Sequence, residues 1–370
     1  MRKPRVVVLT SIMAPHRIAA FNALAADPDL DVSFVYLART DPSREWHAHE
    51  DEMRFRHHLL HERGRIRRGP AYVHFSTGLL SALRETRPDV LVVGGWDQVA
   101  NLEAYGLRDL LRCRFIWWIE SNLRDRRPVS SLIHRAKMRF IASADGVVVP
   151  GVSSREYVSA LGAPPDSIWL APNAVDNHRY RGRAGDRSMR SGPVRVLFVG
   201  RLESEKGVLT LLDAWAAVPM SSELTIVGTG SLRARIAERV ATTAMRPVKL
   251  LGHQGRDDLA DHYAGADIFV LPSVSDPWGL VLNEAMAAGL PVVASSAAGA
   301  VAELVEHGRN GFVVEPWDAG ALWHSLSALI TDPAERIRMG GESSAMIDAF
   351  TPAAWAEGMR EAILGVLRAA

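Results

Sequence analysis

Short apolar runs alternate with segments of helical periodicity along most of the chain. Runs rich in valine and isoleucine, without polar alternation, are typical of strands buried on both faces of a parallel sheet. In the N-terminal half these runs lie at Arg5–Leu9, Val32–Leu37, Asp89–Val93, Arg114–Ile119, Gly146–Val149 and Ile168–Ala171. Because helical segments separate most of them, this half is predicted to be a parallel sheet covered by helices on both faces.

The pattern restarts after a polar stretch without periodicity, from about His178 to Pro193. Further strands are expected at Val194–Val199, Leu224–Val227, Val248–Leu251, Ile268–Leu271, Pro291–Ala294 and Gly311–Val314. Helices are expected at Lys206–Val218, Ser231–Ala244, Asp257–Ala264, Leu280–Ala288 and Ala300–Glu306, and a last one from Pro352 to about Leu367. The fold class is therefore predicted to be α/β, with two doubly wound domains in tandem that bind ligands at the carboxyl ends of their strands.

The domain limits follow from the same pattern. We expect an N-terminal domain over residues 1–183, a linker over 184–193 and a C-terminal domain over 194–351. A chain of 370 residues, 48% of them hydrophobic, can bury two cores, so a disordered protein is excluded.

Charge is distributed unevenly along the chain. Residues 1–190 hold 29 Lys and Arg against 21 Asp and Glu, whereas residues 191–370 hold 14 against 21. The N-terminal half therefore favours anionic partners, such as an anionic lipid surface or a phosphate-bearing acceptor. Nucleic acid is not expected, because the zinc-finger spacings, basic zippers and aromatic runs that contact bases are missing from the sequence.

The cysteine content and the N-terminus bear on the compartment. The single cysteine, Cys113, excludes an internal disulfide and a cysteine-based zinc site, which suits a reducing cytoplasm. Met1–Leu9 superficially resembles a secretory signal, but Pro15–Arg17 interrupts the short apolar run, so a buried first strand is the better interpretation. No run approaches the roughly 20 apolar residues that cross a bilayer, and any membrane contact would be peripheral.

The most informative segment is Ser273–Ala294, SVSDPWGLVLNEAMAAGLPVVA. It places an acidic residue and a Trp-Gly pair between an apolar strand and an alanine-rich helix. Because the free N–H groups of a helix start favour anions, Gly279, Leu280 and Val281 are candidates to hold a diphosphate. Glu284, about one turn further along, can accept two hydrogen bonds from a ribose diol. The segment therefore predicts a nucleotide diphosphate site.

Asp276 and Glu284 lie eight positions apart, and with the residues between them they resemble the Glu-x7-Glu signature of retaining glycosyltransferase family 4. Three other stretches resemble motifs of that family: Val199–Gly207 its phosphate-binding strand and loop, Ile226–Arg233 its glycine turn, and Ala171–Asp176 its Asn-Gly-Val-Asp segment. The resemblance is strong from about residue 140 to 350. Upstream, Ala14–Arg17 and Phe21–Leu24 are similar to the Pro-Tyr-Arg opening of a branch that often builds surface polysaccharides.

The resemblance implies the GT-B fold, in which two Rossmann-like domains face a central cleft and the last helix, here residues 352–370, packs back on the N-terminal domain. It also implies that Arg201 and Lys206 hold the diphosphate of the donor, beside Gly200 where a ligand can approach the backbone. Fixed cations are needed because the diphosphate leaves with developing negative charge. The alternative is an exposed Arg and Lys at a helix start, where cations are unfavourable unless an anion is bound.

Three further segments are candidates for the donor site, and some of them also allow a purely structural interpretation. Asp276 is one methylene shorter than the family's first Glu, so its carboxylate keeps the charge but reaches less far, and its contact with the hydroxyls of the donor sugar is expected to change. The Gly228–Gly230 pair also resembles a dinucleotide fingerprint but lacks the third glycine, so a turn lining the nucleotide site or a plain turn is favoured. The resemblance places the base pocket at Gly252 and His253.

In the N-terminal domain, Glu120 ends a strand where many family members carry a histidine. It is a candidate to orient the acceptor hydroxyl or the reacting sugar, or else to bond a neighbouring loop. Trp96 is a candidate to stack on a sugar, with a core role as the alternative. His16 and Arg17, at the carboxyl end of the first strand, are candidate acceptor-binding residues.

Five histidines suggest a metal site at first sight: His47, His49, His57, His58 and His61. They lie in an Arg-rich stretch, residues 39–70, without the helix-borne ligand spacing of a zinc hydrolase, so a solvated loop near the acceptor entrance is expected instead. This loop and the basic residues from Arg124 to Arg139 either contact anionic lipid or form a solvated face.

Taken together, the sequence predicts a retaining glycosyltransferase that moves a sugar from a nucleotide diphosphate sugar to an acceptor hydroxyl, in polysaccharide, lipopolysaccharide or glycoconjugate biosynthesis. The acceptor is a glycan, a lipid-linked molecule or a small molecule. We expect neither metal nor further cofactor, and a cytoplasmic location that can include the inner membrane face. The alternatives are a nucleotide-sugar epimerase of the same fold, a non-catalytic nucleotide- or glycan-binding subunit and, more remotely, a nicotinamide dehydrogenase.

Overall fold

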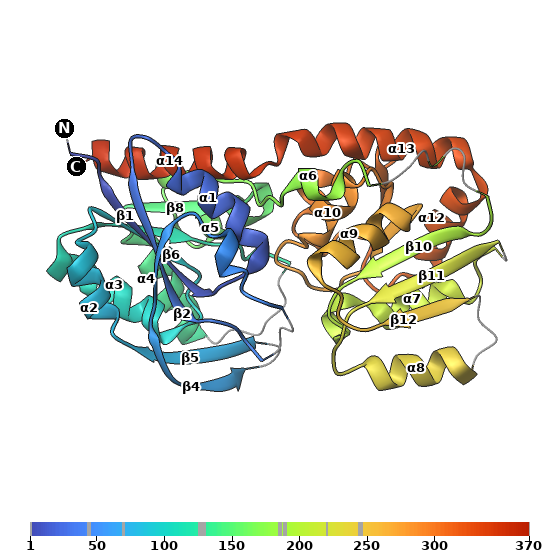
Figure 1. Cartoon of the computed structure of the whole chain (residues 1–370), viewed down its shortest axis with the longest axis horizontal. Helices are drawn as coiled ribbons and strands as arrows, with labels where there is room; N and C mark the ends of the chain where they lie inside the picture. Colours follow the sequence, from blue (N-terminus) through green and yellow to red (C-terminus); the bar gives the residue numbers. More distant parts are fainter. Residues whose placement is uncertain are drawn as a thin grey trace. The chain divides into compact units, whose positions relative to one another are not determined.

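The computed structural model of the protein describes residues 2–42, 46–68, 71–124, 131–183, 187, 191–219, 221–242 and 247–369. The chain divides into two compact units, drawn in Figure 1. The N-terminal unit comprises residues 1–123, 127–175 and 351–370, and the C-terminal unit comprises 124–126 and 176–350. The boundary at residue 175 lies upstream of the predicted limit at residue 183. Residues 176–183 therefore belong with the C-terminal unit.

The N-terminal unit is built on a seven-stranded sheet with the order β3-β2-β1-β6-β7-β8-β9. Its strands are β1 (Arg5–Ile12), β2 (Asp31–Ala38), β3 (Arg56–Leu59), β6 (Val90–Gly94), β7 (Arg114–Trp118), β8 (Gly146–Val149) and β9 (Ile168–Leu170). All neighbouring strands are parallel. Side chains alternate along β1, so that Val6 and Val8 join one core and Val7 and Leu9 the other. The predicted parallel sheet is confirmed.

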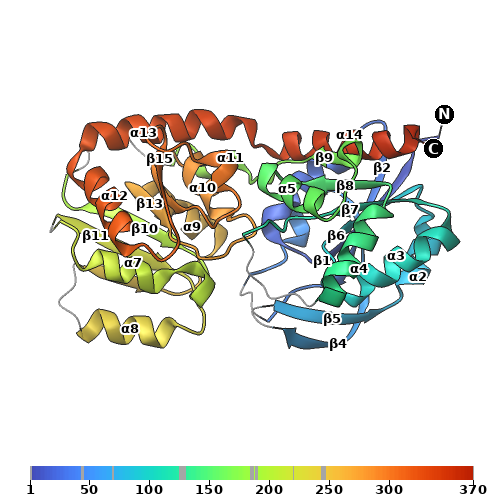
Figure 2. The same ribbon diagram turned by 180° about the vertical axis from the view of Figure 1, so that it is seen from behind.

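Helices cover both faces of this sheet (Figures 1 and 2). They are α1 (Ile18–Ala25), α2 (Leu79–Thr86), α3 (Val99–Leu111), α4 (Ser131–Ala142), α5 (Val152–Ala160) and α14 (Pro352–Arg368). One core contains residues of α1 and α14, and the other contains residues of α2, α3, α4 and α5. The final helix lies close to the sheet, because a Cβ atom added at Gly358 would stand only 2.0 Å from the carbonyl oxygen of Leu170.

The prediction of a solvated loop over residues 39–70 is wrong for the part that the structure describes. It contains β3, which extends the parallel sheet at its edge, and β4 (His61–Arg68), which forms an antiparallel hairpin with β5 (Ala71–Thr77). Apolar periodicity does not reveal them, because edge strands are held by backbone hydrogen bonds and present polar side chains to solvent.

Polar contacts join the two strands of the hairpin and attach the hairpin to the rest of the unit. His74 is almost fully buried, and its ring Nδ1 lies 2.9 Å from a carboxylate oxygen of Glu62. The backbone N–H of His74 donates to the side-chain oxygen of Gln98, whose amide nitrogen donates to the carbonyl of Tyr72. The hydroxyl of Ser76 donates to the carbonyl of Leu37. These polar contacts fix a segment that the hydrophobic pattern does not fix.

The C-terminal unit has a six-stranded parallel sheet with the order β12-β11-β10-β13-β14-β15. Its strands are β10 (Val194–Val199), β11 (Ser222–Val227), β12 (Val248–Leu251), β13 (Ile268–Leu271), β14 (Val292–Ser295) and β15 (Gly311–Val314). Its helices are α6 (Asn177–Tyr180), α7 (Val208–Trp215), α8 (Arg233–Thr242), α9 (Arg256–Gly265), α10 (Val281–Ala287), α11 (Val301–Leu304), α12 (Ala319–Thr331) and α13 (Pro333–Met346). Helices α7 and α12 pack together on one face (Figure 2). Two doubly wound sheets are thus confirmed.

One predicted helix start is wrong in a way that matters for the site. A helix was expected from Lys206, but Ser204–Lys206 is a 3-10 turn and α7 begins at Val208. Gly207 has φ +67°, and a Cβ atom there would stand 1.9 Å from the carbonyl oxygen of Pro272. Only glycine allows the two backbones to approach so closely. Within the described residues, no helix is both long enough and apolar enough to cross a membrane.

Candidate functional site

The C-terminal unit brings together loops from three adjacent strands. The loops after β10 and β11 pack backbone to backbone, since a Cβ atom at Gly228 would stand 1.9 Å from the carbonyl oxygen of Gly200, and one at Gly230 would stand 2.5 Å from that of Leu202. The loop after β13 joins them, because Val274 donates its N–H to the carbonyl of Glu205 at 2.8 Å. The glycines of the sequence motifs thus allow close contact between loops.

Lys206 and Asp276 form an ion pair across two of these loops. Both side chains are largely buried, with 14% of Lys206 and 7% of Asp276 exposed. Gly279, with φ +98°, lies beside the pair, because a Cβ atom there would stand 3.4 Å from the Asp276 carboxylate. The predicted cation and the first acid of the eight-residue motif are therefore in direct contact.

Arg201 also has a carboxylate partner. Its guanidinium lies 2.8 Å from Glu205, and each side chain is about a quarter exposed. The sequence drew attention to the two cations but not to Glu205, which lies one residue before Lys206 in the same loop. An anion that binds here has to compete with Glu205 for Arg201 and with Asp276 for Lys206.

Glu284 lies in the first turn of α10, whose N-cap residue is Leu280 and whose first residue is Val281. Its side chain is buried, and each of its carboxylate oxygens accepts a tyrosine hydroxyl. Tyr180 donates to Oε1 at 2.9 Å and Tyr263 donates to Oε2 at 2.7 Å. Burial raises the pKa of Glu284 above its usual value, although both hydrogen bonds act in the opposite direction.

Neither tyrosine is indicated by a sequence motif. Tyr180 ends α6, in the polar stretch that was predicted to lead into the linker, and Tyr263 is in α9. A local signal for α6 exists, because Asp176 caps its start by accepting the N–H of His178. Nothing in the sequence, however, connects Tyr180 to a residue 104 positions later.

The proposed base-pocket residues follow β12. The carbonyl of Gly252 accepts the N–H of Gly228 at 3.1 Å, which ties this loop to the glycine turn. The side chain of His253 is exposed. Neither position is blocked by packing, since a Cβ atom at Gly252 would meet nothing within 4 Å.

In the N-terminal unit, the structure joins two predicted residues at the carboxyl edge of the sheet. Arg17, in the short turn Pro15–Arg17 after β1, forms an ion pair with Glu120, which follows β7. Arg17 also donates to the side-chain oxygen of Asn173 at 2.9 Å, and its guanidinium lies 4.5 Å from the ring centre of Trp118. Arg17 is therefore held on three sides, while one third of the Glu120 side chain remains exposed.

Trp96 packs against the core rather than presenting a free ring face. Its ring makes edge contacts with Trp117 and Tyr157, and the ammonium of Lys137 lies 4.5 Å from its ring centre. Lys137 also donates to the hydroxyl of Tyr157 at 3.1 Å. A sugar could stack on Trp96 only after Lys137 had moved, so the core interpretation is favoured.

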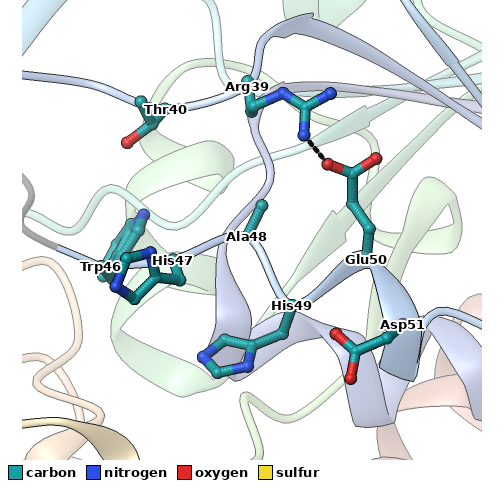
Figure 3. A pocket seen from close by; sticks show the side chains of 8 residues that line it. All are labelled: Arg39, Thr40, Trp46, His47, Ala48, His49, Glu50 and Asp51. Atoms are coloured by element: carbon teal, nitrogen blue, oxygen red, sulfur yellow. Dashed lines mark hydrogen bonds and ion pairs between the residues drawn. The ribbon is translucent and has the colours of Figure 1, made fainter.

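His16 lies beside a cavity of about 580 Å³ in the N-terminal unit, through a ring contact with Trp46 at 5.7 Å. The cavity is lined by Arg39, Thr40, Trp46, His47, Ala48, His49, Glu50 and Asp51 (Figure 3). Two of these residues, Arg39 and Glu50, form an ion pair with each other. An aromatic face surrounded by hydroxyl, imidazole, carboxylate and guanidinium groups suits a polar ligand with a flat apolar side.

The five histidines of the predicted loop are distributed over several elements. His47 and His49 line the cavity, His57 and His58 are in β3, and His61 begins β4. Among the described residues, no group of three or more histidine, cysteine, aspartate or glutamate side chains is arranged to hold a metal ion.

The chain matches two family models. The model described as glycosyl transferase 4-like domain covers residues 5–174, and the model described as glycosyl transferases group 1 covers residues 193–332. Each match lies almost entirely within one of the two units, so the family assignment extends over most of the chain.

Among curated proteins, the chain is 32% identical over 214 residues to the glycogen synthase of Mycobacterium tuberculosis, covering 56% of this chain and 50% of that protein. It is 34% identical over 198 residues to the D-inositol 3-phosphate glycosyltransferase of Pseudarthrobacter chlorophenolicus, covering 50% and 47%. The chain thus spans about half the length of these relatives.

Among solved structures, HepE of Anabaena in complex with UDP and glucose superposes with a TM-score of 0.76 at 18% identity, covering 97% of this chain and 99% of that one. At this identity the likeness concerns the fold, which is the two-domain GT-B fold expected from the resemblance. The family models and this architecture agree, and the chain belongs to the glycosyltransferases of GT-B fold.

Proposed function

We propose that the protein transfers a sugar from a nucleotide diphosphate sugar to an acceptor hydroxyl, with retention of the anomeric configuration and without a metal ion. The observation that carries the proposal is the Lys206–Asp276 ion pair, with Arg201 in the same loop as Lys206. It places two cations beside loops whose backbones only glycine allows to come so close. The glycosyltransferase relatives and the UDP complex of HepE support the same donor class.

In this mechanism Arg201 and Lys206 exchange their carboxylate partners for the oxygens of the donor's diphosphate. They then stabilise the negative charge that develops as the sugar–phosphate bond breaks. Glu284 accepts hydrogen bonds from the ribose hydroxyls, and Asp276, released from Lys206, accepts hydrogen bonds from the hydroxyls of the donor sugar. The acceptor attacks from the face that the diphosphate leaves, and a diphosphate oxygen takes its proton.

The acceptor is held by the N-terminal unit. Glu120 orients the attacking hydroxyl, and Arg17 keeps the Glu120 carboxylate in place. The cavity beside His16, with Trp46 as its aromatic wall, accommodates a polyhydroxy group. The acceptor class that fits this lining is a glycan or glycoconjugate, and a lipid-linked form would bring the protein to the inner face of the membrane from the cytoplasm.

Binding tests the donor class. UDP, GDP and ADP are titrated against the protein while thermal unfolding is recorded, since a ligand at about 100 times its dissociation constant adds about 2.7 kcal/mol of stability. One nucleoside diphosphate is expected to raise the melting temperature clearly more than the others. If none of the three raises it, the proposed donor site is wrong.

Turnover tests the mechanism, with sugars of the nucleoside diphosphate that binds best as the donors. The Arg201→Ala variant is expected to lose about 10²–10³-fold in kcat, as is usual when one preorganised charge-stabilising group is removed. The matched control is Arg239→Ala in α8, because Arg239 also pairs with a carboxylate, that of Asp213. Activity should persist in chelator, and NMR of the product should show the anomeric configuration of the donor. Inversion, or an epimer formed from the donor alone, would exclude a retaining transferase.

A further inference from the structure

Glu284 is surrounded by two tyrosines to which the proposed function gives no role. The carboxylate is buried between a tyrosine from α6 and a tyrosine from α9, whose rings meet edge to face with centres 5.6 Å apart. Tyr263 is completely buried, whereas small fractions of Tyr180 and Glu284 remain exposed. Of the two tyrosines, Tyr180 is the one with any exposure to solvent.

The hydrogen-bond pattern of this cluster matches an ionised Glu284, although the Tyr263 hydroxyl also lies 3.4 Å from the carbonyl oxygen of Val281. Each tyrosine hydroxyl has a single proton to donate, and each donates to a different oxygen of Glu284. A carboxylate oxygen has two acceptor positions, so one position on each oxygen remains available. Two such positions match the two donors of a ribose diol. A protonated carboxyl would lose one of them, because its own O–H is a donor.

Burial acts against the ionised form. It is the largest influence on the pKa of Glu284 and raises it, while hydrogen bonds from Tyr263 and Tyr180 and the charge of Arg256 lower it. Arg256 and Tyr263 belong to α9, and Tyr180 belongs to α6, where Arg179 acts in turn on Tyr180. Because burial still raises the pKa of Glu284 overall, the ionised carboxylate depends on the two tyrosine hydroxyls, which donate hydrogen bonds to it directly.

We propose that Tyr180 and Tyr263 are positioning residues that keep Glu284 ionised and direct its free acceptor positions at the ribose, so that donor binding depends on pH. This inference rests on the proposed function. It adds two residues to the site, and they serve the vicinal diol that the proposed function assigns to Glu284, rather than the phosphates or the base.

The test measures the dissociation constant of UDP, GDP and ADP by calorimetry from pH 5 to pH 9, for the wild type and for Tyr180→Phe, Tyr263→Phe and the double variant. Removing a hydroxyl raises the pKa of Glu284 further. As the pH is lowered, affinity for the nucleotide should therefore begin to fall at a higher pH than in the wild type. At neutral pH each single variant is expected to bind about tenfold more weakly, as the loss of one hydrogen bond to a charged group predicts. Affinity should recover toward the wild-type value at high pH.

Two controls separate positioning from general damage. Glu284→Gln, which cannot ionise, should bind weakly with a flat profile between the same pH limits. Tyr105→Phe, in the N-terminal unit, removes a tyrosine hydroxyl that bonds Ser143 and should leave the profile unchanged. The 2′-deoxy form of the best-binding nucleotide should lose affinity for the wild type but not for Glu284→Gln.

The outcomes distinguish the two proposals. If the wild type binds none of the three nucleotides, the proposed function and this inference both fail. If the wild type binds but the profiles of Tyr180→Phe and the wild type coincide, the positioning role is wrong while the donor site stands. Tyr180→Phe carries the test if Tyr263→Phe does not fold, since Tyr180 is the less buried of the two.

Discussion

Asp276 and Glu284 are two buried carboxylates of one loop and helix, and the C-terminal unit stabilises them by different means. Asp276 is neutralised by the ammonium of Lys206, whereas Glu284 receives two neutral hydroxyls. In the proposed mechanism, the first arrangement keeps a cation beside its counter-ion until the diphosphate binds. The second leaves a carboxylate whose pKa is raised by burial and which can respond to pH. Neighbouring acids can thus have unlike roles because their partners differ.

The largest expected effect comes from breaking the ion pair. Lys206→Met keeps the length of the side chain but leaves the buried Asp276 carboxylate without the Lys206 ammonium, which should lower the free energy of unfolding by about 3–5 kcal/mol. Urea unfolding measures it. Lys206→Arg retains the charge and should lose much less. A loss below about 1 kcal/mol in Lys206→Met would mean that water reaches the Asp276 carboxylate.

Removing one hydroxyl should have the next largest effect. Tyr263→Phe deletes a donor to a buried carboxylate without removing the ring, and about 2 kcal/mol of unfolding free energy should be lost. Tyr180→Phe should lose less, because Tyr180 is slightly exposed and water can replace its hydroxyl. Equal losses in the two variants would contradict the difference in burial.

The pH dependence of stability sharpens the comparison. Since the pKa of Glu284 is raised in the folded state from 4.5, the folded protein holds this proton more tightly than the unfolded chain. The contribution of Glu284 to stability is therefore fully present below about pH 4.5 and is lost as pH rises through the raised pKa.

The difference in unfolding free energy between the wild type and Glu284→Gln isolates this group. It should fall with rising pH in that window, by up to about 1.4 kcal/mol per pH unit. Urea unfolding at a series of pH values measures it. A difference that rises with pH would show that the hydrogen bonds outweigh burial.

The smallest effect is expected for an exposed pair of the same kind. Lys249 lies 3.1 Å from Glu223, with more than half of the lysine side chain exposed. Lys249→Met should change the free energy of unfolding by less than about 1 kcal/mol, because exposed ion pairs are screened by water. Urea unfolding of Lys249→Met and Lys206→Met under the same conditions measures both losses. Similar losses in the two variants would show that burial does not determine how much such an ion pair contributes.

Most of the fold could be predicted because parallel strands buried on both faces are continuous apolar runs. β8, β10, β12, β13 and β15 have the predicted limits. The hairpin β4–β5 could not be predicted, since its attachment depends on buried polar groups such as His74 and Gln98. Hydrogen bonds of this kind join residues that are distant in the sequence, and the hydrophobic periodicity does not reveal them.

The candidate site divides in the same way. Arg201, Lys206, Asp276 and Glu284 are recognisable from motif spacing, which reflects loops at fixed places after strands. Their partners are less visible: Glu205 is near in sequence but unremarkable, and Tyr180 lies in a stretch without periodicity. Motifs indicate which groups meet a ligand, whereas the groups that tune them come from tertiary packing.

The helix α14 has a consequence for the order of folding during synthesis. Residues 351–370 supply Trp355, Met359 and Ile363 to the core around α1, although the rest of that unit precedes residue 176. On the ribosome, residues 176–350 are therefore all available before the first-made unit has received its last helix. The part translated first completes its core last, and until then an apolar surface sized for one helix stays uncovered beside a nascent chain.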